Sequence, residues 1–243
     1  MNKTFLITGA SSGIGAEIAK HLANGNRIII HYNSSKEKAS TVADAVTERG
    51  GKAHLIQANL STQQGCEEVA KFVKEQIPNQ LDCLINNAGG IIKQHQTEGT
   101  TWDCIENLFH LNTFSTIYLS SLCIPLMKPD SNASIINITS TIIRSGGTVG
   151  PIYAASKGAI DVFTRSLARE VAPDIRVNAI APGVIETPFH DVTPDKKMQE
   201  VIQMTPLKKT GQPNDIAQVV AMLIENTFIT GETIDVNGGL YMR

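Results

Sequence analysis

Tyr153 and Lys157 are the two residues of this 243-residue chain whose types and spacing point most directly to chemistry. Side chains four residues apart lie on one face of a helix, so the phenol and the ammonium group would be neighbours. A free tyrosine ionises near pH ~10, and a neighbouring cation favours the phenolate and lowers that pKa. Ser140 adds a hydroxyl thirteen residues upstream. These groups suit proton donation to a carbonyl oxygen, although Tyr-x-x-x-Lys is also a common surface pair on helices.

A glycine-rich turn follows the first apolar run, Phe5-Leu6-Ile7, and leads into a helical pattern. Glycines permit a tight turn, let the backbone approach a pyrophosphate and allow close packing of helix on strand, while free N–H groups at the helix start receive the negative charge. The spacing over residues 9–15 is G-x-x-x-G-x-G, which differs from the general G-x-G-x-x-G fingerprint. Its place at the end of the first strand favours a nucleotide site over a plain turn.

Short β-branched runs alternate with amphipathic stretches along the whole chain. This alternation predicts an α/β fold with a parallel, doubly wound sheet. Strands are expected near residues 4–8, 27–32, 53–59, 82–86, 134–139, 176–180 and 233–236. The sequence has no internal repeat, low-complexity tract or linker, so residues 1–243 are expected to form a single domain.

Helices are expected between the strands, for example over residues 36–49, with Ser34 or Ser35 as N-cap. Two longer helices are expected over residues 101–127 and 153–172. The least regular segment, about residues 184–207, holds three prolines and follows a strand. Ligands of such sheets bind beyond the carboxyl ends of the strands, so we interpret this segment as a lid over the substrate, with a passive loop as the alternative.

The composition argues against several classes of partner. A formal net charge of -2 gives no electrostatic case for nucleic acid or a membrane surface. No apolar stretch is long enough to span a bilayer, and the one after Met1 is too short for a signal-peptide core. The cysteines lie far apart without a C-x-x-C pair, so free thiols in a reducing compartment are expected, no metal is predicted, and the cytoplasm is the expected location. They are Cys66, Cys83, Cys104 and Cys123.

Taken together, the motifs resemble the classical short-chain dehydrogenase/reductase family over essentially the whole chain. The matching segments are the turn at residues 8–15, Asn86-Asn87-Ala88-Gly89, Asn112, Ser140, Tyr153, Lys157, Pro182-Gly183 with Thr187, and residues 229–239. The resemblance implies a Rossmann-type doubly wound parallel sheet of about seven strands. It also implies an NAD(P)-dependent enzyme that interconverts a carbonyl and a secondary alcohol, similar to the 3-oxoacyl-acyl-carrier-protein reductases of the family.

The resemblance implies catalytic roles for four residues. Tyr153 would donate the proton to the carbonyl oxygen as the nicotinamide hydride reaches the carbon, and Ser140 would hold that oxygen. Lys157 would lower the pKa of Tyr153 and bind the nicotinamide ribose. Asn112 resembles the family asparagine that fixes a water between the lysine and solvent, which completes a proton relay.

The implied cofactor contacts spread along one edge of the predicted sheet. In chain order they are Gly9, Ser11, Ser12, Gly13, Ile14, Gly15, Tyr32, Asn33, Ser34, Asn59, Leu60, Asn86, Ala88, Gly89, Tyr153, Lys157, Pro182, Gly183, Ile185 and Thr187. Asn59 stands where the family usually has an aspartate that accepts a bond from the adenine amine. Its carbonyl still offers an acceptor.

The end of the second strand bears on the choice between NADP and NAD. An NAD site usually has an acid there to hold the ribose hydroxyls, whereas this chain has Tyr32 followed by Asn33-Ser34-Ser35-Lys36. Without an acid at this position, a 2′-phosphate would meet no charge repulsion, and the hydroxyls, the amide and the lysine of this segment could bind it. Ser12, however, replaces the basic residue of many NADP-dependent relatives. NADP(H) is therefore expected over NAD(H). The alternative is that Ser34 and Ser35 only cap the following helix.

The substrate stays open at this point. Its pocket would be lined by residues 90–96, 141–150 and the lid, which specify no single ligand. Acyl carrier protein is acidic, and its expected docking regions at residues 127–133 and Pro173-Asp174 hold few cations. A ketoreductase of a small free molecule and an acyl-thioester reductase both remain. A catalytically silent dinucleotide-sensing protein is a rival from another class, which the complete set of catalytic residues argues against.

The two long helices carry apolar residues on more than one face, so each needs a second partner surface. The resemblance implies that these helices pair across a two-fold axis and that the C-terminal segment completes a homotetramer. Leu240, Tyr241 and Met242 would then be buried between subunits.

Overall fold

A parallel sheet of seven strands organises the chain. The computed structural model describes residues 3–77, 81–91, 97–127, 132–146, 150–190 and 195–242, and its strands lie in the order β3-β2-β1-β4-β5-β6-β7. Every pairing between them is parallel, which confirms the predicted doubly wound sheet. The strands are β1 (Thr4–Ile7), β2 (Arg27–Tyr32), β3 (Lys52–Gln57), β4 (Cys83–Asn86), β5 (Ala133–Ile138), β6 (Ile175–Pro182) and β7 (Thr233–Val236).

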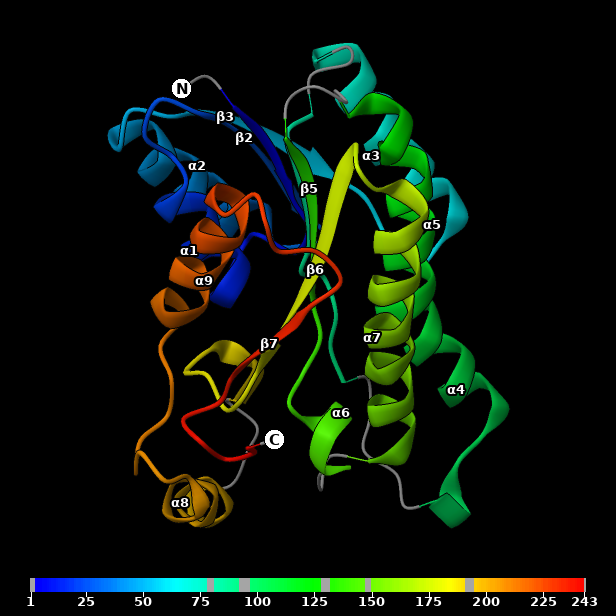
Figure 1. Ribbon diagram of the computed structural model, residues 1–243, viewed down its shortest axis with the longest axis vertical. Coiled ribbons are helices and arrows are strands. Elements are labelled where there is room, and N and C mark those ends of the chain that lie inside the picture. The colour runs from blue at the N-terminus through cyan, green and yellow to red at the C-terminus, as the bar shows by residue number, and fades with distance from the viewer. Residues whose placement is uncertain are drawn as a thin grey trace.

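Helices cover both faces of the sheet, as Figure 1 shows. Helices α1 (Gly13–His21), α2 (Lys36–Glu48) and α9 (Pro213–Glu225) pack on one face, in a core that includes Ile28 and Ile30. Helices α3 (Gln63–Gln76), α5 (Ser115–Cys123) and α7 (Pro151–Val171) pack on the other, in a core that includes Ile29 and Leu84. Strands covered on both faces lose the alternation of polar and apolar residues, and β4, β5 and β6 are buried along their whole length.

The strand order reverses between β1 and β4, and this position is where such sheets bind their ligands. The chain leaving β1 and the chain leaving β4 are held together there through one threonine. The Thr8 hydroxyl accepts hydrogen bonds from the backbone N–H groups of Asn87 and Ala88, both at 2.9 Å, and the Thr8 N–H donates to the Ile85 carbonyl at 3.0 Å. The glycine turn is therefore fixed against the end of β4.

The helix expected over residues 101–127 is interrupted. It consists of α4 (Trp102–Phe109), a π-helical turn (His110–Phe114), α5 and a 3-10 turn (Ile124–Leu126). In the π-helical turn the Ser115 N–H reaches back five residues to the His110 carbonyl. The carbonyl oxygens of Leu111 and Asn112 accept side-chain hydroxyls instead, from Ser115 at 2.6 Å and Thr116 at 3.0 Å. These hydroxyls stabilise a turn that α-helical hydrogen bonding leaves incomplete.

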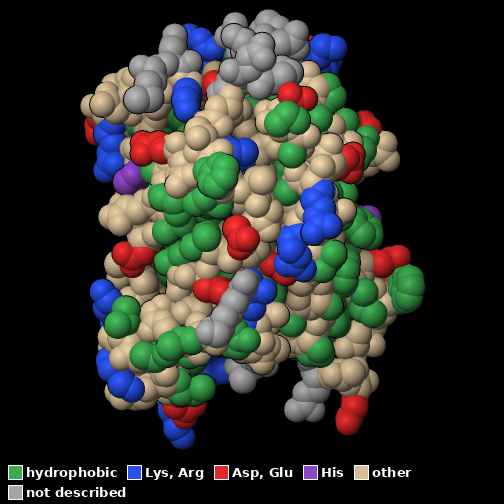
Figure 2. Space-filling model, viewed as in Figure 1, with side chains coloured by type: hydrophobic (Ala, Val, Ile, Leu, Met, Phe, Trp, Pro, Cys, Tyr) green, Lys and Arg blue, Asp and Glu red, His purple; other side chains and the backbone are tan. Residues whose placement is uncertain are grey.

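The predicted lid contains a short 3-10 turn (Pro188–His190) and α8 (Asp195–Met204), while residues 191–194 lie outside the described part of the chain. None of the helices among the described residues is long and apolar enough to cross a membrane. On the face shown in Figure 2, lysines and arginines are interspersed with acidic side chains and form no broad field of one sign. This agrees with the small net charge of the sequence.

Candidate active site

A cavity of about 440 Å³ opens at the carboxyl edge of the sheet. Its walls come from the glycine turn, from the ends of β4, β5 and β6, from α7 and from the lid. Many of the residues predicted from the sequence share this wall. They are Gly9, Ser12, Gly13, Ile14, Ala88, Gly89, Ser140, Tyr153, Lys157, Pro182, Gly183, Ile185 and Thr187.

Steric limits explain the glycines of the turn. Gly9 has φ +62°, and a Cβ there would lie 2.9 Å from the Ala88 Cα. A Cβ on Gly15 would lie 2.6 Å from the Gly9 carbonyl oxygen, so Gly15 serves the packing of α1 under the turn and does not line the cavity. Ser12 precedes α1 without capping it through its side chain. The start of α1 therefore suits an anionic ligand.

His31 and Asn87 also hold this turn, and the sequence analysis assigned a site role to neither. The Gly9 N–H donates to His31 Nδ1 at 3.1 Å, and Nε2 of the same ring lies 3.0 Å from the Ala58 carbonyl oxygen. Burial lowers the pKa of His31, which its bond to Ala58 partly offsets. A neutral ring with its proton on Nε2 satisfies both contacts. The Asn87 amide donates to the carbonyls of Thr8 and Gly9 at 2.8 and 3.1 Å.

Of the residues predicted to bind the adenosine half, Ala88 and Gly89 line the cavity, whereas those at the ends of β2 and β3 lie outside its wall. Tyr32 is 5% exposed and belongs to the core that α2 covers. Asn33 and Ser34 are exposed at the end of β2. Asn59 is exposed too, and its side-chain oxygen accepts the Ser61 N–H at 3.0 Å. Leu60 lines a second cavity, of about 300 Å³, between α3 and α5.

Asn86 and Ser11 also differ from the expected arrangement. The Asn86 amide donates to Ser120 Oγ at 3.0 Å and to Asn137 Oδ1 at 2.9 Å, inside the core. Its side chain therefore stabilises the contacts of β4 with β5 and α5. Ser11 is half-buried in the glycine turn, outside the cavity wall. The exposed neighbour Gly89 does line the cavity.

Tyr153 and Ser140 meet in the cavity. The Ser140 side chain hydrogen-bonds the Tyr153 phenol, and its oxygen also accepts the Ile142 N–H at 3.3 Å. Burial raises the pKa of Tyr153 to about 12, against a smaller lowering effect of the Ser140 bond. The phenol is therefore fully protonated at neutral pH and can act as an acid.

The expectation that Lys157 lowers the pKa of Tyr153 is not met in this structure. The lysine is buried, and its Nζ donates to the Ile138 carbonyl at 2.9 Å. Desolvation lowers the pKa of Lys157 to about 8, so it keeps most of its charge at neutral pH. Desolvation of Tyr153 is the larger effect on the phenol, and sequence spacing carries no information about it.

Asn112 lies behind the cavity wall, in the π-helical turn, with its side chain fully buried. Its amide accepts the Gly90 N–H at 2.8 Å and donates to the Gly90 carbonyl at 3.0 Å and to Ser156 Oγ at 3.2 Å. A Cβ on Gly89 would lie 2.8 Å from Asn112 Oδ1 and 3.0 Å from Lys157 Nζ. The asparagine and the lysine therefore flank the same glycine, as a relay between them requires.

The segment predicted to form a lid contributes to the cavity wall beside Tyr153, at the end of the cavity where reduction is expected. The rings of Phe189 and Tyr153 are 6.5 Å apart between centroids, and Val201 of α8 lines the cavity as well. The base of the lid is fixed, because the Glu186 N–H donates to the Gly211 carbonyl and the Gly211 N–H to the Val184 carbonyl, both at 2.9 Å.

The cavity wall is suited to acid catalysis by Tyr153 and offers few other reactive groups. None of its described residues carries a carboxylate, and Lys157 is its one cation among them. In the described part of the chain no group of histidine, cysteine or acidic residues could hold a metal ion. Burial raises the pKa of Cys66 to about 11 and those of Cys83 and Cys123 to about 12, which leaves these thiols unreactive.

Comparison with known proteins agrees with this geometry. A family model described as enoyl-(acyl carrier protein) reductase matches residues 9–241. The chain is 36% identical over 249 residues to the 3-oxoacyl-[acyl-carrier-protein] reductase FabG of Staphylococcus epidermidis, with 100% of both chains covered. The chain belongs to the classical short-chain dehydrogenase/reductase family.

Solved structures of similar proteins share the fold of this short-chain dehydrogenase/reductase. A short-chain dehydrogenase/reductase from Serratia marcescens gives a TM-score of 0.91 at 31% identity and covers 98% of this chain and 97% of that one. The angucycline C-6 ketoreductase LanV, solved with bound NADP, gives a TM-score of 0.91 at 27% identity and covers 98% and 95%. This protein is accordingly an NAD(P)-dependent oxidoreductase that interconverts a carbonyl and an alcohol.

Proposed function

We propose that this short-chain dehydrogenase/reductase reduces a small, free ketone with NADPH and that Tyr153 supplies the proton. The observation that carries the proposal is a protonated phenol bonded to Ser140 in the same cavity as the glycine turn. A dinucleotide held by the glycine turn would supply the hydride for the carbonyl carbon. Negative charge then develops on the carbonyl oxygen, where Ser140 donates a hydrogen bond and Tyr153 transfers its proton.

Lys157 and Asn112 support that transfer. When Tyr153 loses its proton, the buried ammonium of Lys157 favours the phenolate, so its effect grows during the reaction. The position of Lys157 Nζ beside Gly89 also suits a hydrogen bond to the nicotinamide ribose. Asn112 flanks the same glycine and is proposed to hold the water that returns a proton from solvent through Lys157.

The chain's residues fit a dinucleotide. The absence of a side chain at Gly9 and Gly13 lets the turn approach Ala88 and Thr187 closely, the Ser12 side chain does not cap α1, and the cavity extends from the turn to Tyr153. Ile185 and Thr187 are proposed to hold the carboxamide. The exposed residues Asn33 and Ser34 support a preference for NADP over NAD, because neither puts a carboxylate where a 2′-phosphate would lie. The NADP bound in the structure of LanV agrees with this preference.

The apolar character of the reacting end supports a free ketone as substrate. Ile142, Val184, Phe189, Val201 and Leu240 surround it. The second candidate is a 3-oxoacyl thioester carried by acyl carrier protein, favoured by the similarity to FabG. Of the docking regions expected for that acidic partner, residues 128–131 lie outside the described part of the chain, and the other region holds Asp174.

Loss of NADPH absorbance with a panel of ketones and acetoacetyl-coenzyme A tests the proposal. We expect turnover of at least one small ketone, with a higher kcat/KM than for the thioester. A preference for the thioester would favour the second candidate. Binding of NADPH without turnover of any carbonyl would favour a dinucleotide-sensing protein and contradict the proposed function.

We further propose a cytoplasmic homotetramer. Large apolar side chains are exposed on α4, α5 and α7, namely Trp102, Ile117 and Val162, and Phe114 of the π-helical turn is exposed beside them. A second copy of the chain is the proposed cover. Met242 is 69% exposed, which supports a partner at the C-terminus as well. Light scattering should report a tetramer, and deletion of residues 240–243 should reduce it to a dimer. A stable, active monomer would contradict the proposal.

A further inference from the structure

Ser140 stands at the start of a segment that cannot hold its own shape. The segment turns through α6 (Ile142–Ser145), a helix of four residues that ends at Gly146 with φ +71°. Helices this short are unstable in isolation, because few hydrogen bonds offset the ordering of the backbone. The position of the Ser140 hydroxyl therefore depends on contacts that α6 makes with other parts of the chain.

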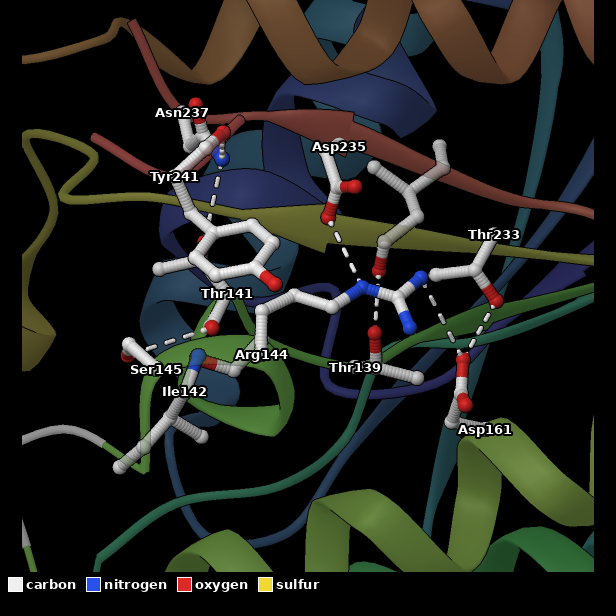
Figure 3. A network of polar contacts seen from close by, with 12 residues as sticks. Thr139, Thr141, Ile142, Arg144, Ser145, Asp161, Thr233, Asp235, Asn237 and Tyr241 are labelled. Atoms are coloured by element: carbon white, nitrogen blue, oxygen red, sulfur yellow. Dashed lines mark hydrogen bonds and ion pairs between the residues drawn. The ribbon is translucent and has the colours of Figure 1, made fainter. Parts of the chain in front are cut away.

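Arg144 supplies the charged contact of α6, as Figure 3 shows. Its Nε lies 3.5 Å from Asp235 Oδ1 in β7, and its Nη2 lies 3.8 Å from Asp161 Oδ1 in α7. The side chains of Arg144, Asp161 and Asp235 are only 15%, 9% and 19% exposed. Charges this far from water are weakly screened, so the attraction among them is stronger than that of a surface pair.

The two acidic partners are themselves parts of the active-site frame. Tyr153, Lys157 and Asp161 follow one another at intervals of four residues, so they lie along one face of α7. Thr233 of β7 donates its hydroxyl to Asp161 Oδ1 at 2.7 Å, which joins β7 to α7. Arg144 thus connects the segment of Ser140 to the helix that carries Tyr153.

A second contact fixes the same segment from the C-terminal side. The Asn237 amide donates to Thr141 Oγ1 at 3.1 Å and to the Tyr241 carbonyl at 3.0 Å, as drawn in Figure 3. This contact acts on the residue next to Ser140, whereas the contact of Arg144 acts on the far end of α6. The two together restrain the segment at both ends.

We propose that Arg144 is a positioning residue, which holds the Ser140 hydroxyl against Tyr153 by joining α6 to Asp161 and Asp235. The inference rests on the proposed function of Ser140 and Tyr153. Loss of the guanidinium removes the charged contact that ties α6 to β7 and α7, so α6 can shift relative to both. Ser140 then leaves the phenol, while the glycine turn and its cofactor contacts stay in place.

Arg165 provides a matched control. It also pairs with Asp161, through Nη1 and Oδ2 at 2.5 Å, but it belongs to α7 itself and its side chain is half-exposed, so this pair does not join α7 to α6. An effect that comes from the charge on Asp161 alone would follow from either arginine. An effect that comes from the position of α6 follows only from Arg144.

The experiment is a double-mutant cycle measured with NADPH and a ketone that the wild-type enzyme reduces. Arg144→Met should lower kcat by roughly tenfold or more while the Kd of NADPH changes less than about threefold, and Arg144→Lys should recover most of the loss. Arg165→Met should stay within about twofold of wild type. In a Ser140→Ala background, Arg144→Met should cost no more than about twofold, because the group that it positions is already gone.

An equal loss of kcat in both backgrounds, or none in the wild-type background, would overturn the proposal. If Arg144→Met does not fold, Asp235→Asn loosens the same contact with the arginine kept and should show the same dependence on Ser140. Crystal structures of the Arg144→Met or Asp235→Asn protein and of Arg165→Met give a result that needs no turnover. Ser140 should leave Tyr153 only when the contact of α6 is changed, so failure of the inference and failure of the proposed function are separable.

Discussion

The two ends of the active-site cavity are held by different kinds of interaction. At the glycine turn, backbone atoms pack so closely that Cβ atoms added at Gly9 or Gly15 would lie within 2.9 Å of neighbouring backbone. Thr8 and His31 accept main-chain N–H groups there and Asn87 donates to main-chain carbonyls, which fixes the turn. At the reacting end, Ser140 depends on the side-chain contacts of a four-residue helix. The shape of the first end is set by close backbone packing, so few substitutions there avoid a steric clash. The second can change while the fold persists, which suits a wall that selects among substrates.

Tyr153→Phe should have the largest effect, and it acts on the reacting end alone. Loss of the proton donor should lower kcat by ~100-fold or more, while the Kd of NADPH stays near that of wild type. Steady-state kinetics and fluorescence titration of NADPH measure the two quantities. Tyr118→Phe, which removes a hydroxyl bonded to Glu67 on α3, is the control and should leave kcat unchanged. A Tyr153→Phe enzyme with more than about a tenth of wild-type kcat would rule out the assigned role.

His31→Gln tests the cofactor end. The Gly9 N–H loses its acceptor in a buried site, which should cost about 1–3 kcal/mol of unfolding free energy and weaken NADPH binding with it. Denaturant unfolding with and without NADPH measures both. His31→Asn offers an acceptor closer to the position of Nδ1 and should lose less. Equal stability of His31→Gln and wild type would show that the turn does not need this contact.

The same histidine should give stability a dependence on pH. Burial places its folded pKa below the unfolded value of ~6.5, so between the two values the unfolded chain binds a proton that the folded chain does not. The contribution is therefore complete above pH ~6.5 and is lost as the pH falls. His31→Asn should remove this part of the slope.

Asn33→Asp tests the preference for NADP over NAD, at the end of β2. Because Tyr32 belongs to the core, the exposed Asn33 is the position where we expect an introduced carboxylate to meet a 2′-phosphate without disturbing the fold. The ratio of kcat/KM for NADPH over NADH should fall about tenfold, or about 1.4 kcal/mol. Asn33→Ala removes the amide without adding charge and should shift the ratio less. A wild-type enzyme that prefers NADH would contradict the NADP assignment directly.

The smallest expected effect is the dependence of turnover on pH. The pKa of Lys157 is lowered to about 8, so kcat/KM for reduction, which reports groups of the free enzyme, should decline above that pH as the ammonium is lost. Rates measured between pH 6 and pH 10 at fixed ionic strength test this. A profile that stays flat to pH 10 would show that the charge on Lys157 is not needed before the substrate binds.

The sequence predicts well those features that depend on residues close to one another in the chain. The glycine turn, the spacing of Tyr153 and Lys157 and the alternation of strands and helices are local patterns, and the fold follows from them. The burial of Tyr32 also follows from the sequence, because Tyr32 shares the two-residue period of Ile28 and Ile30 and so faces the same core. This period weakens the expectation that the Tyr32 side chain contacts the cofactor.

Other features depend on distant parts of the chain. Asn86 faces Asn137 and Ser120 because β5 and α5 happen to flank it, and His31 reaches Gly9 because β2 lies beside β1. The pKa values of Tyr153 and Lys157 are set by burial, which only the packed structure defines. The expected effect of Lys157 on the phenol failed for this reason.

The π-helical turn His110–Phe114 sets the rotational phase of the helix that contains it. An α-helix advances about 100° per residue, so one additional residue within a turn moves all later side chains to a different face. Asn112 thereby reaches Gly90 and Ser156 while Leu119 and Cys123 still point into the sheet core. Removal of a single residue from this turn would restore regular α-helical bonding, yet it would rotate either the asparagine or the core residues out of register. The length of this helix is therefore a requirement of the active site and not of helix formation.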